Sequence, residues 1–272
     1  MIYKQFNNIQ VPALGLGTWR LSGSECIEIV KMALDIGYRH IDTADAYGNE
    51  ADIGIAHTQT GISREEIFIT TKLPWGQLKG EEVLKNFDSS LNKLRTDYVD
   101  LLLIHWPSTE GTPVDETLEA MKILQAEGKV RAIGVSNFTP NLLKEALQFA
   151  GICCNQVEYH PYLNQNTLLD IAVDHDLMLT AYCPLARGKV NSDKTILSLA
   201  QKHGKLPSQI ALRWLIQQPS VLAIPKTATP EHLKSNIDIF DFELEEDDME
   251  AVFNLNQNLR LIDPPFAPAW NN

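Results

Sequence analysis

Short apolar segments alternate with longer amphipathic segments along most of the chain. Several apolar segments, such as VDLLLIHW at 99–106, lack polar alternation, which is typical of parallel strands covered on both faces. The pattern predicts eight strands, at Leu14–Trp19, His40–Ala44, Ile67–Leu73, Val99–Trp106, Val130–Ser136, Asn155–Tyr159, Leu177–Pro184 and Val221–Pro225. It predicts helices at Glu25–Ile36, Glu82–Leu94, Val114–Glu127, Pro140–Phe149, Thr167–His175, Ile196–His203, Ser208–Gln217 and Pro230–Ile239.

Eight strands separated by helices indicate an α/β fold, either a closed (β/α)8 TIM barrel or an open, doubly wound sheet. A dinucleotide-binding open sheet is expected to carry Gly-x-Gly-x-x-Gly after its first strand. The nearest match in this chain, Gly15-Leu-Gly17, has Arg20 where the third glycine would stand. The pattern therefore favours the barrel.

Two segments extend beyond the repeating strand–helix pattern. The residues before Leu14 predict a β-hairpin that closes one end of the barrel, with its turn at Asn7-Asn8. After Phe240, the sequence DFELEEDDMEAVFNLNQN predicts an extra helix whose acidic start suits the helix dipole. A metal or partner site is the alternative reading of the same acidic residues. No linker interrupts the chain, so residues 1–272 are expected to form a single domain.

Charge and cysteine usage narrow the class of protein. The chain has 23 Lys and Arg against 35 Asp and Glu, a net charge of −12, which argues against a nucleic-acid binder or a polybasic membrane anchor. The four cysteines form no CxxC pair. No amino-terminal signal core is present, and no segment approaches the roughly 18 apolar residues of a membrane span. We expect a soluble protein in the reducing cytoplasm.

Four residues with chemically active side chains fall at or just after the ends of predicted strands. In a barrel of this kind, reactive groups lie at the carboxyl ends of the strands and in the loops that follow. Each residue alone has a structural explanation, such as a loop cap or a buried histidine that is already hydrogen-bonded. Their occurrence together at one rim predicts an active site made of Asp42, Tyr47, Lys72 and His105.

Six motifs extend this prediction to nearly the whole chain: HIDTADAYGNE, ITTKL, LLIHWP, IGVSNF, NQVEYHP and AIPKT. In this order they resemble the motifs of the aldo-keto reductase family. The overall pattern looks most like bacterial members that reduce 2,5-diketogluconate or methylglyoxal. The resemblance implies a TIM barrel that binds NADPH in an extended pose and reduces carbonyl groups by hydride transfer.

The resemblance also implies roles for the four rim residues. Tyr47 is then the proton donor, and the ammonium of Lys72 lowers the pKa of the phenol toward the working pH. Asp42 holds Lys72 charged and oriented. A neutral His105 donates a hydrogen bond that polarises the substrate carbonyl.

Cofactor contacts carry over from the same motifs. Residues implied at the nicotinamide end are Gly17, Thr18, Asp42, Ser136, Asn137, Gln156 and Tyr182, the last stacking on the ring. The loop implied to cover the pyrophosphate is Pro184, Leu185, Ala186 and Arg187. The residues implied to bind the adenosine phosphate are Lys226, Thr227, His232 and Asn236. Outside the family context, Ser136-Asn137 reads as an ordinary turn.

The adenosine segment departs from the family pattern at two positions. The family usually reads Lys-Ser-x-x-x-x-Arg-x-x-Glu-Asn, whereas this chain has His232 for the arginine and Ser235 for the glutamate. Histidine does not grip a 2′-phosphate bidentately as arginine does. NADP remains the expected cofactor because Lys226 and Thr227 are present and Lys234 lies nearby, with NAD as the alternative.

The substrate pocket implied by the resemblance has an aromatic rim, consisting of Trp19, Tyr47, Trp75, His105 and Trp106. The loop at 107–113 and the tail after Asn258 are both short. Short loops predict an open, shallow pocket for small aldehydes and ketones, such as methylglyoxal-like dicarbonyls and keto-sugars.

Other functions remain open at this point. The first is a regulatory protein that binds the cofactor without turnover, and the second is an aldolase that forms a Schiff base at Lys72. A metal-dependent hydrolase is disfavoured, because no His-x-His is present and the histidines form no ligand cluster. We expect a monomer with a small-molecule carbonyl substrate and neither a nucleic-acid nor a membrane partner.

Overall fold

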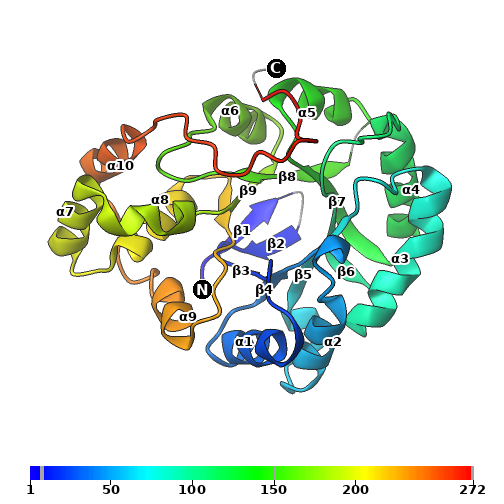
Figure 1. The fold of residues 1–272 in the computed structure, drawn as a ribbon, viewed down its shortest axis with the longest axis horizontal. Coiled ribbons are helices and arrows are strands. Elements are labelled where there is room, and N and C mark those ends of the chain that lie inside the picture. Colours follow the sequence, from blue (N-terminus) through cyan, green and yellow to red (C-terminus); the bar gives the residue numbers. More distant parts are fainter. Residues whose placement is uncertain (7–8, 150, 271–272) are drawn as a thin grey trace.

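Parallel strands ringed by helices form the body of the molecule (Figure 1). The computed structural model describes residues 1–6, 9–149 and 151–270. Within these ranges one sheet contains eight parallel strands in sequential order: β3 (Leu16–Gly17), β4 (His40–Asp42), β5 (Phe68–Leu73), β6 (Val99–Ile104), β7 (Val130–Ser136), β8 (Ile152–Glu158), β9 (Met178–Tyr182) and β10 (Val221–Ala223). Every predicted strand is present, with ends that differ by a few residues.

The first and last strands of this sheet pair with each other. Leu14 and Gly17 form parallel bridges with Ala223 and Lys226. The amide of Gly15 donates to the carbonyl of Ala223 at 2.9 Å. Because both edges of the sheet are hydrogen-bonded to one another, the sheet is closed, and the predicted (β/α)8 barrel is confirmed over the open sheet.

Helices cover the outside of the barrel. They are α1 (Gly23–Asp35), α2 (Glu50–Thr58), α3 (Gly80–Leu94), α4 (Val114–Ala126), α5 (Pro140–Leu147), α6 (Asn166–Asp174), α7 (Lys194–His203), α8 (Pro207–Gln217), α9 (Pro230–Ile237) and α10 (Glu246–Phe253). Short 3-10 helices occur at η1 (Asp45–Tyr47), η2 (Arg64–Glu66) and η3 (Ala186–Ser192). The eight predicted helices are all found. At the start of α5, the hydroxyl of Thr139 accepts the amide of Leu142, and Pro140 occupies the first turn.

Helix α2 was not predicted from the sequence, and a glycine explains its packing. Its backbone lies so close to the end of α3 that a Cβ at Gly54 would meet the carbonyl oxygen of Lys93 at 2.2 Å. Glycine is a weak helix former, so the residue that permits the contact also weakens the helical signal in the sequence. Only the packing of α2 on α3 reveals the element.

We expect Gly54→Ala to destabilise the protein by about 3 kcal/mol, because the added methyl group must push two backbones apart. Gly80→Ala is the matched control, since a Cβ there has its nearest neighbour at 3.7 Å, an ordinary contact. Urea unfolding followed by circular dichroism measures both variants. Equal stability of the two variants would contradict the close-packing explanation.

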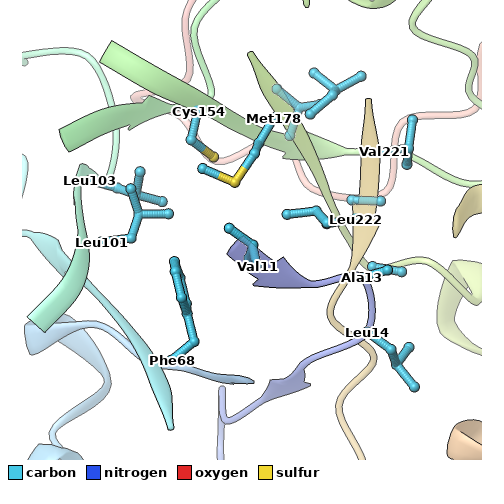
Figure 2. Close-up of a cluster of buried hydrophobic side chains, with 14 of the residues drawn as sticks. Val11, Ala13, Leu14, Phe68, Leu101, Leu103, Cys154, Met178, Val221 and Leu222 are labelled. Atoms are coloured by element: carbon cyan, nitrogen blue, oxygen red, sulfur yellow. The ribbon is translucent and has the colours of Figure 1, made fainter. Parts of the chain in front are cut away.

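The predicted amino-terminal hairpin is present as β1 (Tyr3–Phe6) paired antiparallel with β2 (Ile9–Pro12). Its predicted turn at Asn7-Asn8 lies outside the described residues. Figure 2 shows Val11 of β2 pointing into an apolar cluster that includes Phe68, Leu101 and Met178. Phe68 and Met178 are the first residues of β5 and β9. The hairpin therefore closes the amino end of the barrel and leaves the carboxyl end for the functional site.

The acidic segment after Phe240 forms α10, as predicted. Asp248 accepts hydrogen bonds from Lys202 at 2.8 Å and from His203 at 2.7 Å, both on α7. The acidic start of α10 thus has partners within the chain. Across the part of the chain that the structure describes, no group of three or more metal-ligating side chains is found. The helices described there also include none long and apolar enough to cross a bilayer.

Candidate active site

The four rim residues predicted from the sequence converge at the carboxyl end of the barrel, which we call the mouth. Asp42 ends β4, Lys72 is the next-to-last residue of β5, and His105 directly follows β6. Tyr47 ends the 3-10 turn η1 after β4. Because neighbouring parallel strands end at the same edge, residues far apart in sequence meet here.

A buried ion pair lies at the centre of the mouth. The ammonium of Lys72 donates to Asp42 Oδ1 at 2.6 Å and to the carbonyl of Thr43 at 2.7 Å. Asp42 Oδ2 accepts from Gln156 Nε2 at 2.7 Å. Burial acts to lower the pKa of Lys72, but Asp42 and Tyr47 outweigh it, so the pKa of Lys72 is raised. Lys72 is therefore a fully charged ammonium ion held in one orientation.

The position of Tyr47 depends on the loop that follows β4. Asn49 is fully buried and accepts the hydroxyl of Thr43 at 2.7 Å. Its amide donates to the carbonyls of Thr18 and Leu21, both at 2.9 Å. These bonds tie the loop to the end of β3. The turn can close because Gly48 adopts a left-handed conformation with φ of 70°.

Tyr47 lies between the charged lysine and His105. The Lys72 Nζ atom is 5.1 Å from the Tyr47 ring centroid, and the Tyr47 and His105 rings meet edge to face at 5.6 Å. Burial raises the pKa of the Tyr47 phenol, and Lys72 offsets only part of this rise. The net shift is upward, opposite to the lowering expected from Lys72, because the loss of hydration around the half-buried phenol is the larger effect. Tyr47 is consequently a neutral phenol that retains its proton at neutral pH.

His105 is a neutral imidazole. Burial, with a smaller contribution from the Lys72 charge, lowers the pKa of His105 to about 3. Its Nδ1 atom is buried and has no hydrogen-bond partner among the described residues. A neutral ring beside Tyr47 can donate one hydrogen bond without adding a positive charge.

A second group of hydrogen-bonded polar residues lies at the ends of β7, β8 and β9. It is linked to the four rim residues through His105. The hydroxyl of Tyr182 donates to Asn137 Oδ1 at 2.7 Å. Asn137 Nδ2 donates to the carbonyl of His105 at 2.9 Å, and Ser136 Oγ donates to the carbonyl of Gln156 at 2.8 Å. The structure therefore brings together all four residues implied at the nicotinamide carboxamide and ring.

Gly17 and Thr18 complete this side of the mouth. The Thr18 hydroxyl donates to the carbonyl of Asp42 at 2.9 Å. A Cβ at Gly17 would meet the carbonyl oxygen of Ile224 at 2.8 Å, so glycine permits β3 to approach the end of β10. Both residues thus adjoin Asp42 and the closure of the barrel.

The residues implied for the phosphates lie on the neighbouring loops. After β9, Ala186 and Arg187 have positive φ values of 47° and 52° in the bend that contains Pro184 and Leu185, and Arg187 is exposed. After β10, Lys226 is exposed while Thr227 is buried. On α9, His232 is exposed and Asn236 is buried. Exposed cations next to the mouth suit an anionic dinucleotide.

Aromatic side chains cover the opposite side of the mouth. The Trp75 ring meets the His105 ring at 5.6 Å. Trp106, the residue after His105, is buried. Trp19 is 43% exposed, with the Arg20 guanidinium 4.3 Å from its ring centroid. Among the described residues, Trp19 has no ring contact with Trp75 or Trp106, so the structure does not join it to the other aromatic residues.

Two aromatic residues of the carboxyl-terminal segment were not predicted. Phe266 stacks on Trp75 at 4.7 Å and contacts Trp106 edge to face at 5.4 Å. Trp270 contacts Trp106 at 6.0 Å. The end of the short tail thus lies on these two tryptophans, a contact that the sequence did not predict. The apolar sequence FAPAW was the only signal for this contact.

The geometry defines a class of protein: a closed (β/α)8 barrel whose mouth holds a neutral tyrosine, a charged lysine and a neutral histidine next to polar and aromatic walls. The profile of the Aldo/keto reductase family matches residues 13–257. The chain belongs to this family and is an oxidoreductase. Aldo-keto reductases use nicotinamide cofactors.

Individual relatives share most of the chain. Methylglyoxal reductase DkgB of Escherichia coli O157:H7 is 40% identical over 96% of this chain and 99% of its own length. Glyoxal reductase of Bacillus subtilis strain 168 is 41% identical over 95% of this chain and 94% of its own. A crystal structure provisionally assigned as 2,5-diketo-D-gluconic acid reductase B superimposes with a TM-score of 0.96 at 44% identity, covering 99% of this chain and 98% of that one.

Proposed function

We propose that this protein reduces small aldehydes and ketones to alcohols with NADPH, and that Tyr47 is the proton donor. The observation that carries the proposal is the position of the neutral Tyr47 ring between the Lys72 ammonium and the His105 ring. When bound, the nicotinamide supplies the hydride. The residues of the mouth then hold the carbonyl group and deliver the proton.

Tyr47 donates the proton in this proposal, and Lys72 stabilises the phenolate that remains. The raised pKa of Tyr47 keeps the phenol protonated until the carbonyl oxygen becomes strongly basic. As the proton leaves, the nearby Lys72 ammonium stabilises the phenolate, because opposite charges attract strongly in a site shielded from water. Asp42, at 2.6 Å, keeps Lys72 charged throughout.

His105 is suited to orient the substrate. Its lowered pKa keeps the ring neutral, so it donates a hydrogen bond to the carbonyl oxygen without competing with Tyr47 as an acid. Trp75 and Phe266 on the other side provide an apolar wall. Such a pocket suits compact carbonyl compounds, including dicarbonyls of the methylglyoxal type and keto-sugars.

The state of Lys72 disfavours the aldolase alternative. A Schiff base requires a neutral amine as nucleophile. Here the pKa of Lys72 is raised, its side chain is fully buried, and its ammonium bonds both Asp42 and the Thr43 carbonyl. The amine is thus neither deprotonated nor free to attack.

The proposed cofactor is NADP(H), held along the mouth by three groups of residues. We assign the nicotinamide end to Ser136, Asn137, Gln156 and Tyr182, and the hydrogen bonds of Ser136 with Gln156 and of Tyr182 with Asn137 support this assignment. Arg187 lies on the left-handed bend after β9, where a cation suits the pyrophosphate. Exposed Lys226 suits the 2′-phosphate.

We further propose that the protein acts as a single-domain monomer in the cytoplasm. The four cysteines are free thiols, three of them buried, which suits a reducing compartment. Exposed large apolar side chains such as Ile123, Val173 and Leu197 lie on different helices and form no shared patch on one element. Light scattering coupled to size-exclusion chromatography tests the monomer.

The decisive experiment follows NADPH absorbance at 340 nm with a panel of methylglyoxal, glyoxal and keto-sugars. Turnover of at least one member supports the reductase. Tight NADPH binding without turnover of any carbonyl compound would support the regulatory alternative instead. Borohydride trapping with the same panel checks Lys72, and a trapped adduct would contradict the proposed role of this residue.

For cofactor choice, we expect His232→Arg to lower the KM for NADPH by about tenfold and to leave the KM for NADH nearly unchanged. Arginine adds a charged, bidentate contact to the 2′-phosphate, which NADH lacks. Lys144→Arg is the control, because it adds a guanidinium group on α5, outside α9. Steady-state kinetics with both cofactors measures the effect. An equal change for NADH would show that His232 does not face the phosphate.

A further inference from the structure

The carboxyl-terminal segment 254–270, which we call the tail, crosses the loop between β8 and α6. In Figure 1 it is the red segment that runs from α10 past β8 and β9 toward α5. The amides of Gln257 and Leu259 donate to the carbonyl of Tyr162 at 3.0 and 2.9 Å. Asn256 Oδ1 accepts the amide of Asn164 at 3.2 Å. The first part of the tail is thus hydrogen-bonded to this loop.

Glu158, the last residue of β8, binds the next part of the tail. Its Oε1 accepts the amide of Leu261 at 2.8 Å, and its Oε2 accepts the amide of Ile262 at 3.0 Å. The guanidinium of Arg260 lies 3.8 Å from Oε2. The Glu158 side chain is fully buried. A buried carboxylate with these partners is a fixed attachment point for residues 260–262.

His160 adds a further donor to Glu158. Its Nδ1 accepts the amide of Tyr162 at 3.3 Å, so in the neutral ring the proton resides on Nε2. That nitrogen lies 3.0 Å from Glu158 Oε1 and donates to it. Each described hydrogen-bond partner of the two carboxylate oxygens is therefore a donor. An amide in place of the carboxylate would turn a donor toward other donors.

Beyond this attachment, the tail reaches the aromatic wall of the mouth. Phe266 stacks on Trp75 at 4.7 Å. Trp270 donates from Nε1 to Asp263 at 2.8 Å and lies under the Arg260 guanidinium, 3.7 Å from the ring centroid. The residues bound by Glu158 thus come shortly before Phe266 and Trp270, which contact the two tryptophans.

We propose that Glu158 is a positioning residue for the carbonyl pocket. It holds the tail at residues 260–262 and thereby places Phe266 over Trp75. Glu158 forms no described hydrogen bond to any of the four rim residues. It pairs with Tyr182 across β8 and β9, so an effect through Tyr182 would appear in the Kd for NADPH, whereas an effect through the tail appears in the KM for the carbonyl substrate. The kinetic part of this inference rests on the proposed carbonyl reductase function; the attachment of the tail does not.

The test begins with Glu158→Gln, which keeps the shape of the side chain and removes one acceptor oxygen. We expect the KM for the carbonyl substrate to rise about tenfold, because the tail loses its hold on the pocket. We expect kcat and the Kd for NADPH to stay within about twofold, since Tyr47 and Lys72 are untouched. An unchanged KM, or an equal fall in kcat, would overturn the inference.

Limited trypsin digestion gives a readout that does not depend on turnover. Arg260 is the only Lys or Arg after Lys234, so cleavage there releases residues 261–272 as a single peptide. The nitrogen of that bond is the Leu261 amide, which donates to Glu158 in the parent protein. We expect Glu158→Gln to speed this cleavage about tenfold. Unchanged cleavage would show that Glu158 does not hold the tail.

Asp100→Asn is the matched control. Asp100 is a buried carboxylate on β6 that accepts the amide of Ile69 at 2.9 Å and pairs with Arg64 at 2.8 Å. It lies at the start of β6, the opposite end from the mouth. General loosening of the barrel would raise KM and tail cleavage in this variant too, and that result would overturn a specific role for Glu158.

A double-variant cycle separates the tail from other effects of Glu158. Phe266→Ala removes the ring that stacks on Trp75 without touching the attachment. If Glu158 acts by placing this ring, the double variant has a KM no higher than the larger of the two single effects. Multiplied effects on KM would overturn the inference. Absence of turnover in the parent protein would defeat the proposed function alone, since the digestion assay still tests the attachment.

Discussion

Tyr47→Phe is expected to lower kcat for carbonyl reduction about 1,000-fold while leaving the Kd for NADPH within about twofold. The substitution removes only the hydroxyl, so the ring still fills the space between Lys72 and His105. Without the phenolic proton, the oxygen that forms after hydride transfer has no donor at this position. Single-turnover kinetics at 340 nm and NADPH fluorescence titration measure the two quantities.

Tyr98→Phe provides the control for loss of a phenol elsewhere. Tyr98 precedes β6 at the amino end of the barrel, between the guanidinium groups of Arg64 and Arg131. Its hydroxyl is buried with no hydrogen-bond partner among the described residues, so its removal should leave kcat unchanged. Near-parent turnover in Tyr47→Phe would exclude Tyr47 as the proton donor.

Lys72→Met is expected to lower the free energy of unfolding by about 3–5 kcal/mol at neutral pH, in addition to abolishing measurable turnover. The reason is the carboxylate of Asp42, which is 2% exposed and would lose its charged partner at 2.6 Å. A buried ion left unpaired is more destabilising than a buried pair removed as a whole. Urea unfolding at fixed protein concentration measures the change.

The double variant Asp42→Asn, Lys72→Met distinguishes stability from catalysis. Removing both charges should restore a large part of the lost stability, because no ion remains unpaired in the barrel. Turnover should stay absent, because nothing stabilises the phenolate of Tyr47. If the double variant is as unstable as Lys72→Met, the lost stability comes from lost packing around the aliphatic part of the Lys72 side chain. Recovered turnover would remove Lys72 from the proposed mechanism.

The rim residues could be predicted because strand ends are a local property. The apolar segments that become β4, β5 and β6 end at or next to Asp42, Lys72 and His105, and a parallel barrel brings all such ends to one rim. Tyr47 required one further step, since it lies on the turn after β4. The barrel itself followed from the strand–helix alternation together with the missing third glycine at Arg20.

The direction of the Tyr47 pKa shift could not be predicted from the residue types alone. A nearby ammonium lowers the pKa of a phenol, whereas burial raises it, and the balance depends on how much water the ring loses. Only the packed mouth shows that burial outweighs Lys72. The roles carried over by resemblance to Arg187, Lys226 and His232 remain predictions, to be tested with the cofactor.

By itself, the sequence determined the fold class, the family and the set of side chains at the ends of the strands, because hydrophobic periodicity and ordered motifs are readable along the chain. Only the tertiary structure decided which distant residues meet. Gln156 bonds Asp42 across 114 positions, α2 packs on α3 through Gly54, and Glu158 holds the tail that brings Phe266 onto Trp75. These contacts depend on the paths of loops and the close approach of backbones, which no local pattern encodes.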